Sequence, residues 1–398
     1  MKYIVLIGDG MADYPIKELD NRTPLEAAKT ENMDFIARFG RLGRIKTIPD
    51  KMSPGSDVAT FSIFGYDPLK YYTGRGPLEA ANLGIKLEDN DVAFRCNLVT
   101  VYNDKMVDYS AGHISSLEAK RLIEFIDQKL GNEKIKFYPG VSYRNIMLVK
   151  EGMQDNLIEI ESYPPHDIMG ENIQKYLPKG KNAQFLINLI KDSQKLLETH
   201  EINLVRVDLK ENPANMIWLW GQGRRPNMPS FLERYGLKGS VISAVDLIRG
   251  LGSILGMQVI NVPGATGYYD TDYEAKAEAA LKALEENDLV FVHVEAPDEA
   301  GHNGDLRQKI IAIERFDYLV VGTILKAFKR KKNFRILVLP DHATPISLRT
   351  HTKDVVLFGI YGKDIEAGNF LNYSEKEAKK SDLYFDKGYE LMSYFIKG

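Results

Sequence analysis

Three short apolar runs in this chain each lead into a segment that carries an aspartate. The runs and their aspartates are Tyr3–Ile7 with Asp9, Phe291–Glu295 with Asp298, and Arg335–Pro340 with Asp341. Short, β-branched apolar runs indicate strands buried inside an α/β sheet. Open α/β sheets bind their ligands at the carboxyl ends of such strands. The pattern therefore predicts an α/β fold in which distant segments bring carboxylates to one sheet edge.

Histidines accompany two of these aspartates. His302 follows Asp298 by four residues, so both side chains point the same way on a helical turn. His342 follows Asp341 directly, and His351 comes shortly afterwards. Divalent ions such as Mn²⁺ and Zn²⁺ accept mixed shells of carboxylate and imidazole. Any one of these residues alone is more often structural, but their repetition at strand ends predicts a two-metal site.

Ser56 follows the turn that Pro54 and Gly55 force, and it stands where a helix is expected to begin. The commoner role of such a serine is to cap the helix. The alternative is a nucleophile whose alkoxide is stabilised by the helix dipole and by a metal ion. Together with the Asp- and His-bearing segments, the nucleophile is the better interpretation.

The chain has 398 residues, which favours two domains. Residues 1–86 and 226–398 carry the strand-and-helix pattern of the predicted core. Residues 87–225 have a different sequence pattern, with strands and helices that predict a smaller inserted α+β domain. This domain is expected to include a strand at Asn203–Val207. Trp218 and Trp220 lie near the predicted exit from this domain, where we expect interdomain packing.

Composition excludes several classes of protein. The net charge of −3 gives no support to a nucleic-acid binder held by bulk electrostatics, and one cysteine excludes an intrachain disulfide. No apolar run approaches the roughly 20 residues of a transmembrane helix. The N-terminus enters a strand at once, without a signal sequence. We therefore expect a cytoplasmic protein without a membrane or nucleic-acid partner, and nothing in the sequence specifies an oligomeric state.

Several cations are candidates for binding an anionic substrate. Arg75 lies between two glycines, and a surface arginine is an equally good interpretation. Arg224 and Arg225 form a pair that could clamp a phosphate, since guanidinium matches phosphate geometry. Lys276 lies at the start of an expected helix, where a solvated lysine is the usual case.

The ordered motifs resemble a known group of enzymes. They are Gly8-Asp9-Gly10, Pro54-Gly55-Ser56, Pro297–His302, Pro340-Asp341-His342 and Thr350-His351-Thr352. This order resembles the alkaline phosphatase superfamily, and most closely the cofactor-independent phosphoglycerate mutases in their short form, typical of archaea and some bacteria. Gly74–Ala80, Asp108–Ile114 and Trp218–Gly223 are also similar to that form, so the resemblance covers essentially the whole chain.

The resemblance implies a doubly wound, alkaline-phosphatase-like α/β core with an inserted α+β cap that binds substrate. It implies interconversion of 2- and 3-phosphoglycerate, a step of glycolysis and gluconeogenesis, through a phosphoserine on Ser56 and without 2,3-bisphosphoglycerate. It implies two divalent ions, with Mn²⁺ expected and Mg²⁺, Zn²⁺ or Co²⁺ as alternatives. One ion would be held by Asp298, His302 and His351, and the other by Asp9, Ser56, Asp341 and His342.

The resemblance also suggests substrate contacts in the cap and leaves alternatives open. His113 is similar in position to a cap histidine that approaches the phosphate. Arg144, Arg224, Arg225 and Lys276 match the family's phosphate- and carboxylate-binding cations. Asp108 and Asp167 are candidates for the acid/base. Gly55 and Asp57 depart from the Asn and Glu of the longer bacterial form. A metal-dependent phosphatase and a homoserine-kinase-like phosphotransferase remain the alternative functions.

Overall fold

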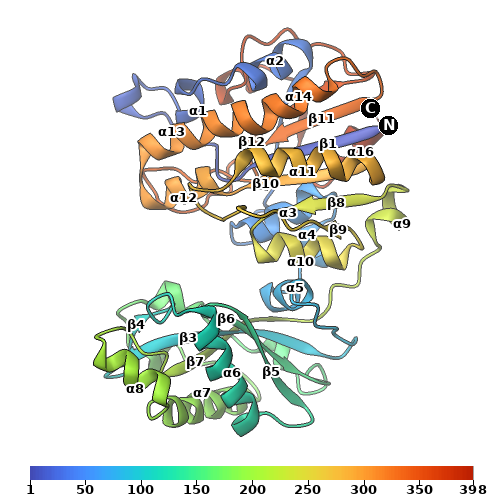
Figure 1. Cartoon of the computed structure of the whole chain (residues 1–398). Coiled ribbons are helices and arrows are strands. Elements are labelled where there is room, and N and C mark those ends of the chain that lie inside the picture. The colour runs from blue at the N-terminus through green and yellow to red at the C-terminus, as the bar shows by residue number, and fades with distance from the viewer. Residues whose placement is uncertain (398) are drawn as a thin grey trace. The chain divides into compact units, whose positions relative to one another are not determined.

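The computed structural model describes residues Met1–Lys397, which form two compact units. Unit 1 contains residues 1–72 and the described residues from 228 on, and unit 2 contains Thr73–Asn227. Helices and strands of both units are labelled in Figure 1. The chain therefore leaves unit 1 once and returns to it once.

Unit 1 is built on an eight-stranded sheet with the order β13-β2-β12-β11-β1-β10-β8-β9. Pairing is parallel except on the two sides of β12, so β12 alone among these eight runs against the others. The strands are β1 (Lys2–Gly8), β2 (Arg41–Ile45), β8 (Gly239–Ile242), β9 (Gln258–Val259), β10 (Leu289–Val294), β11 (Phe334–Leu339), β12 (Val356–Gly362) and β13 (Tyr384–Phe385). The predicted α/β class is confirmed.

Helices cover both faces of this sheet. They are α1 (Pro24–Ala27), α2 (Glu31–Phe39), α3 (Ser56–Ile63), α4 (Pro68–Tyr71), α9 (Phe231–Tyr235), α10 (Asp246–Ile254), α11 (Tyr273–Glu286), α12 (Ala296–Asn303), α13 (Leu306–Arg315), α14 (Gly322–Phe328), α15 (Glu375–Ala378) and α16 (Glu390–Lys397), with a 3₁₀ turn η1 (Lys17–Leu19) and a π-helical segment η5 (Phe316–Val321). Alternate residues of the central strands point to opposite faces. Ile4 and Val290 pack in the cluster with α2, α11 and α14, whereas Phe291 stacks on Phe64 after α3.

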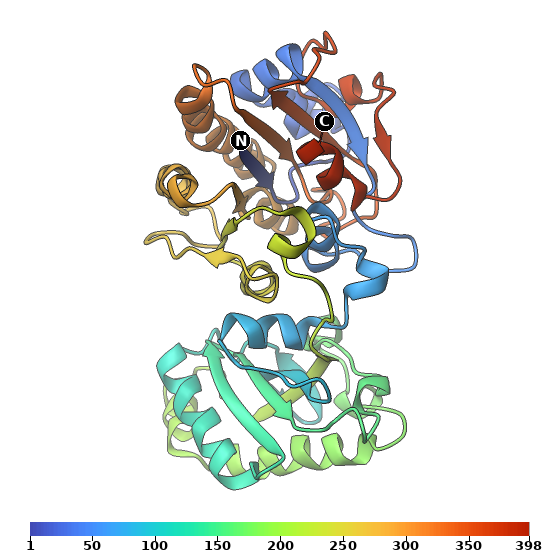
Figure 2. The ribbon, with the colours of Figure 1, turned by 90° about the vertical axis from the view of Figure 1, so that its right-hand side faces the viewer.

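Unit 2 is a five-stranded sheet with antiparallel pairing throughout. Its strands are β3 (Val92–Tyr102), β4 (Lys105–Asp108), β5 (Ile135–Val141), β6 (Arg144–Val149) and β7 (Met216–Gly223). Its helices are α5 (Arg75–Asn82), α6 (Ser116–Leu130), α7 (Ala183–Leu197) and α8 (Glu201–Asp208), with 3₁₀ turns η2 (Leu157–Glu159), η3 (Pro165–Ile168) and η4 (Ile173–Lys175). Helices α6 and α7 lie against β5 and β7 (Figure 2), and α5 contacts β3 and β7.

The segments that enter and leave unit 2 are paired with each other. Thr73 Oγ1 donates a 2.6 Å hydrogen bond to the carbonyl of Arg224. A Cβ on Gly74 would lie 2.1 Å from the carbonyl oxygen of Gln222, and one on Gly223 would lie 2.5 Å from that of Thr73. Only glycine permits this approach, so the two chain segments form one tight stem.

Two predictions about unit 2 are wrong. The expected strand at Asn203–Val207 is part of helix α8, which the His200 side chain caps by accepting from the amide of Ile202. The expected interdomain tryptophans belong to the unit 2 core. The indole of Trp218 donates to the carbonyl of Tyr163, and that of Trp220 donates to Asn97.

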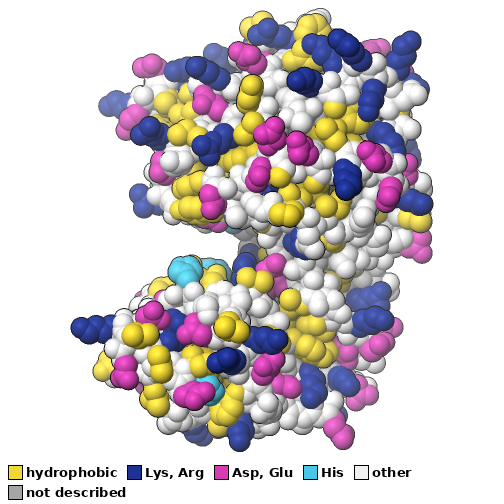
Figure 3. Space-filling view, in the orientation of Figure 1, with side chains coloured by type: hydrophobic (Ala, Val, Ile, Leu, Met, Phe, Trp, Pro, Cys, Tyr) yellow, Lys and Arg dark blue, Asp and Glu magenta, His cyan; other side chains and the backbone are white. Residues whose placement is uncertain are grey.

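Charged side chains of both signs are interspersed over the face of the molecule shown in Figure 3. Within residues 1–397, no helix combines the length and the apolar character that a membrane crossing requires.

Candidate active site

The three aspartates predicted to meet do come together. Strands β11, β1 and β10 are neighbours and run parallel, so their carboxyl ends share one sheet edge. Asp9 follows β1, Asp341 follows β11, and Asp298 lies in the first turn of α12 after β10. All three carboxylates are buried. The continuous apolar runs of the three strands thus place acidic groups together at the carboxyl edge of the sheet.

A glycine allows the segments after β1 and β10 to approach closely. Gly10 has φ +59°, and a Cβ there would lie 2.6 Å from both Asp298 Oδ1 and Thr344 Oγ1. The Gly10 amide donates to Asp341 Oδ1 at 3.1 Å, and the His342 amide donates to the same oxygen at 2.9 Å. One oxygen of Asp341 is therefore held by the backbone, and Oδ2 is left for another partner.

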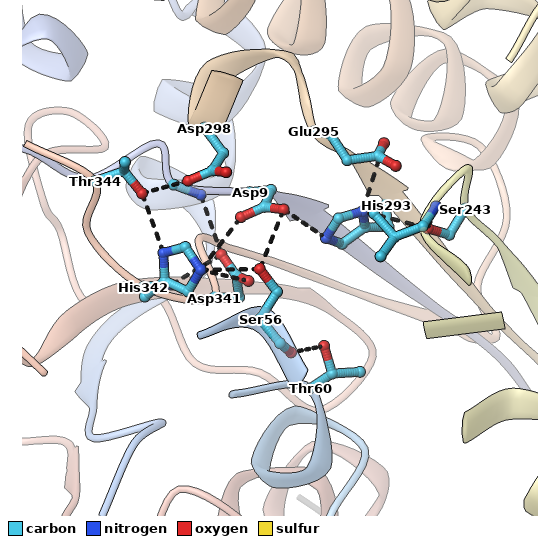
Figure 4. A network of polar contacts seen from close by, with 12 residues as sticks. Asp9, Ser56, Thr60, Ser243, His293, Glu295, Asp298, Asp341, His342 and Thr344 are labelled. Carbon is cyan, nitrogen blue, oxygen red and sulfur yellow. Dashed lines mark hydrogen bonds and ion pairs between the residues drawn. The ribbon is translucent and has the colours of Figure 1, made fainter. Parts of the chain in front are cut away.

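Ser56 joins this group from helix α3. It is the first residue of the helix, after Gly55 in the N-cap position, and no side chain caps the helix end. The Ser56 hydroxyl lies 3.0 Å from His342 Nε2 and 3.5 Å from Asp9 Oδ2 (Figure 4). The structure therefore directs the hydroxyl at the acidic cluster and gives it no capping role.

The first donor group consists of Asp9, Ser56, Asp341 and His342, and the separations within it suit a cation. His342 Nε2 lies 3.5 Å from Asp9 Oδ1 and 3.3 Å from Asp341 Oδ2. Ligands about 2.1 Å from one ion at tetrahedral angles lie about 3.4 Å from one another. Asp9 Oδ1 and Asp341 Oδ2 are buried and have no hydrogen-bond partner. Buried polar oxygens are almost always partnered, so these two orphans fit a bound cation.

The second donor group consists of Asp298, His302 and His351. Nε2 of His302 lies 3.2 Å from Asp298 Oδ2 and 2.8 Å from Nε2 of His351, which is itself 3.4 Å from Asp298 Oδ1. Thr344 connects the two groups, because its hydroxyl donates to Asp298 and lies 3.2 Å from Nδ1 of His342. The seven predicted ligands thus form two adjacent clusters.

Electrostatics distinguish the two groups. Burial, and then the charges of Asp341 and Asp298, raise the pKa of Asp9 well above its ordinary value. Burial lowers the pKa of His342 to about 4, so its ring is neutral and available as a ligand. Burial alone would raise the pKa of Asp298, yet hydrogen bonds from His302 and His351 bring it well below its ordinary value. The first group lacks positive charge, whereas the second balances its carboxylate with imidazoles.

Among residues 1–397, two triads place one donor atom of each member within 4.8 Å of the others. They are Asp298 with His342 and His351, and Asp9 with His293 and Asp341. The first triad combines His342 with two members of the second donor group, because His342 lies between the two clusters. Its Nε2 is nevertheless within 3.5 Å of Ser56, Asp9 and Asp341, which favours placing His342 with the first group.

The second triad introduces His293, which the sequence analysis missed. His293 lies inside strand β10, is fully buried, and has Nε2 3.2 Å from Asp9 Oδ2. A single histidine in a continuous apolar run gives no indication of its surroundings. The available signal was the pair His293 and Glu295, which point to the same face of a strand at spacing i, i+2.

Lys276 is fully buried in helix α11, away from solvent. Its Nζ donates to the carbonyl of His293 at 3.0 Å and to Glu295 Oε2 at 3.2 Å. The ammonium is thus part of a buried network behind Asp9.

The other predicted substrate contacts belong to unit 2. Arg75 is the first residue of α5, Arg144 the first of β6, and His113 lies exposed in the loop after β4. Arg224 and Arg225 are exposed in the segment that follows β7. Arg75 lies 5.7 Å from the Trp220 ring, and Arg144 lies 5.8 Å from the Tyr143 ring, which His113 contacts edge-on.

Unit 2 also gathers residues that the sequence analysis did not select. Arg95 is buried, pairs with Glu79 at 3.1 Å, and lies 4.4 Å from the ring of Trp220. Burial lowers the pKa of Arg95, and the charges of Arg75 and Arg144 lower it further. Three guanidinium groups therefore surround one aromatic cluster, a composition that favours anions.

The two acid/base candidates differ in their surroundings. Asp108 accepts hydrogen bonds from Ser110, Gly112 and Asn212. Burial would raise its pKa, but these bonds outweigh burial and lower it, so Asp108 organises the loop before His113. Asp167 is exposed, and its carboxylate lies 3.7 Å from His166.

Comparison with known proteins identifies similar chains. Residues 37–203 match the family model described as 2,3-bisphosphoglycerate-independent phosphoglycerate mutase. A protein of that name from Methanosarcina acetivorans is 54% identical over 399 residues, covering 100% of each chain. A probable mutase of the same kind from Geobacter sulfurreducens is 49% identical over 401 residues, again covering 100% of each.

Solved structures agree with these relatives. A protein from Pyrococcus horikoshii is 31% identical with a TM-score of 0.85, over 99% of this chain and 96% of the other. The cofactor-independent phosphoglycerate mutase from Thermoplasma acidophilum is 26% identical with a TM-score of 0.68, over 100% of this chain and 99% of the other. The similarity therefore spans both units.

Proposed function

This chain belongs to the family of 2,3-bisphosphoglycerate-independent phosphoglycerate mutases, and on that premise we propose that it interconverts 2-phosphoglycerate and 3-phosphoglycerate through a phosphoserine on Ser56. The observation that carries the proposal is the position of the Ser56 hydroxyl. It opens helix α3 without capping it and lies 3.0 Å from His342 and 3.5 Å from Asp9, two of the proposed cation ligands.

Two divalent ions, Mn²⁺ first among them, are proposed to bind the two donor groups. Asp9, Ser56, Asp341 and His342 would hold one, and Asp298, His302 and His351 the other. Such ions lower the pKa of a hydroxyl and neutralise phosphoryl oxygens. The orphaned oxygens of Asp9 and Asp341 support this assignment.

The protein's own groups account for the covalent steps. Ser56 Oγ loses its proton and attacks phosphorus in line, the bond from phosphorus to the substrate oxygen breaks, and that oxygen takes up a proton, so phosphoserine and glycerate form. The amide groups at the start of α3 favour negative charge there, because the helix dipole is positive at its N-terminus. The other hydroxyl of glycerate then takes the phosphoryl group back, and Ser56 is regenerated. No second phosphate donor enters this cycle.

Unit 2 is proposed to bind the substrate. Arg75, Arg144, Arg224 and Arg225 would bind its anionic groups and His113 would approach the phosphate. Unit 1 is the proposed metal-binding core. Glycerate must stay bound between the two transfers, because water reaching the phosphoserine would turn the mutase into a phosphatase. A cytoplasmic location stays a prediction from the sequence.

The test is a comparison of Ser56→Ala with Ser53→Ala, since Ser53 is exposed on the same loop. Both enzymes are assayed with Mn²⁺ and 3-phosphoglycerate, and 2-phosphoglycerate and free phosphate are measured in parallel. We expect Ser56→Ala to lose several orders of magnitude in rate, because it removes the nucleophile. Ser53→Ala should act like the wild type.

A second measurement addresses the intermediate. Wild-type enzyme quenched in acid during turnover should carry phosphate on the peptide that contains Ser56. Mutase activity near the wild-type rate in folded Ser56→Ala would refute the proposal. Release of free phosphate without 2-phosphoglycerate would instead indicate a phosphatase.

A further inference from the structure

We propose that His293 is a further ligand of the cation bound by Asp9 and Asp341, and that Glu295 and Lys276 hold its ring in place for that purpose. The inference rests on the proposed two-cation site and extends the predicted ligand set by one imidazole from strand β10.

Three buried atoms without hydrogen-bond partners converge at this point. They are Asp9 Oδ1, Asp341 Oδ2 and His293 Nε2. They belong to residues at the ends of the neighbouring strands β1, β11 and β10, and one donor atom from each lies within 4.8 Å of the others. A buried polar atom without a partner is costly, so three of them in one group of neighbouring residues indicate that the group binds a further partner. Two carboxylates and an imidazole make that partner a cation.

The opposite edge of the His293 ring faces an anion. Nδ1 lies 3.6 Å from Glu295 Oε2 and 3.5 Å from the hydroxyl of Ser243 (Figure 4). Lys276 donates to the same Glu295 oxygen, and this ion pair keeps Glu295 a carboxylate. A carboxylate only accepts hydrogen bonds, so it favours a proton on Nδ1 of His293. The lone pair of Nε2 is then on the edge of the ring that faces Asp9, whose Oδ2 lies 3.2 Å away.

This arrangement is close to the one that metal-binding histidines generally adopt, although Nδ1 and Glu295 Oε2 are 3.6 Å apart, just beyond hydrogen-bond distance. A ligating imidazole donates its other N–H to a carboxylate or carbonyl, which fixes the tautomer and the ring orientation. Lys276 strengthens the arrangement further, because it also donates to the backbone carbonyl of His293. One ammonium thus fixes both the strand that carries the ring and the carboxylate that orients it.

The competing interpretation is a doubly protonated His293 that donates to Asp9. Nε2 lies 3.2 Å from Asp9 Oδ2, but the contact is not a hydrogen bond. Lys276 already supplies the positive charge that Glu295 requires. The oxygens of Asp9 and Asp341 that lack a partner are the ones that a cation would bind beside this nitrogen.

The experiment measures cation binding by apo-protein and does not depend on activity. Mn²⁺ titrations by calorimetry compare the wild type with His293→Gln and His293→Leu, and His200→Gln in unit 2 serves as the matched control. Gln keeps a hydrogen-bond donor for Asp9 but not the imidazole. We expect both His293 variants to lose at least about tenfold in affinity for one of the two ions and to keep the other, since even outer-shell partners are worth about 10–100-fold.

The tautomer is tested on the wild-type protein, so the proposal does not depend on how the variants fold. Nitrogen NMR of histidine-labelled enzyme loaded with diamagnetic Zn²⁺ should show His293 protonated at Nδ1 and metal-bound at Nε2. Two N–H protons on His293 in the loaded protein, or wild-type affinity for both ions in His293→Gln, would overturn the inference. Failure of wild-type protein to bind two ions would refute the proposed site itself.

Discussion

The buried ion pair of Lys309 and Asp13 should be one of the most sensitive points in unit 1. Both side chains are almost fully buried, and Nζ of Lys309 lies 2.7 Å from Asp13 Oδ2. Nζ also donates to the carbonyls of Thr344 at 2.7 Å and Ala12 at 3.4 Å. Lys309 thus connects helix α13 to the segments that carry Asp9 and Asp341.

Lys309→Met removes the countercharge and leaves the carboxylate buried. Asp13 would keep hydrogen bonds from the amides of Tyr14 and Ile346, but it would have no cation. Breaking a buried pair on one side costs about 3–5 kcal/mol of the free energy of unfolding. Adding Asp13→Asn should restore part of the loss, with a coupling energy of about 2–3 kcal/mol between the two sites.

Urea unfolding followed by far-ultraviolet circular dichroism measures the free energy. Fluorescence of the two tryptophans, both in unit 2, provides an internal control for the other unit. Lys326→Met is the matched variant, since Lys326 is exposed on the neighbouring helix α14. Mn²⁺ affinity should also fall, because the Thr344 hydroxyl contacts Asp298 and His342. A loss below about 0.5 kcal/mol in Lys309→Met, as at an ordinary surface site, would refute this reasoning.

Further predictions concern the cations, the acid range and two close contacts. Chelation should abolish activity and Mn²⁺ should restore it; full activity in protein shown to be metal-free by elemental analysis would contradict the proposed site. Burial lowers the pKa of His302, but Asp298 outweighs burial and raises it to about 9, so cation binding at pH 7 should release a proton. Calorimetry in buffers of different ionisation enthalpy measures that proton, and added Mn²⁺ should partly offset the loss of activity in acid. Burial raises the pKa of Asp317 to about 6, so the folded state binds the proton more tightly and stability falls by about 2–3 kcal/mol as the pH rises from about 4 to 6. Asp317→Asn should remove that slope in urea unfolding; an unchanged slope would assign it to other groups. Gly10→Ala should weaken Mn²⁺ binding, because its Cβ would lie 2.6 Å from Asp298 Oδ1; unaltered calorimetric affinity would show that the segment adapts.

The three aspartates at the carboxyl edge of the sheet could be predicted because the sequence pattern that indicates each of them is local. A buried parallel strand is a continuous apolar run, and the residue after it must lie at the sheet's carboxyl edge. Asp9, Asp298 and Asp341 were therefore placed without knowledge of the strand order. That β11, β1 and β10 are neighbours depends on long-range pairing, which the runs do not encode.

Other features depend on contacts between distant residues. Asn203 has a β-branched neighbourhood that predicts a strand. In the structure its side-chain Nδ2 donates to the carbonyls of Leu197 and Ala214, which fixes helix α8 to the segments before and after it. Lys276 occupies a helical position where a lysine is usually solvated. Only the packing of α11 against β10 shows that the face of α11 that carries Lys276 is buried. His293 was missed for the same reason, since most of its partners come from other elements of the fold.

The stem formed by Thr73 and Arg224 gives unit 2 the character of a cassette. The chain enters and leaves unit 2 at neighbouring positions. The whole of Thr73–Asn227 could therefore be removed and the two ends of unit 1 joined by a short linker. The same geometry applies during evolution. A gene segment inserted or exchanged at this position does not change the strand register of the sheet in unit 1. The recognition surface of such an enzyme can therefore be replaced as one piece of DNA while the cation ligands are inherited unchanged.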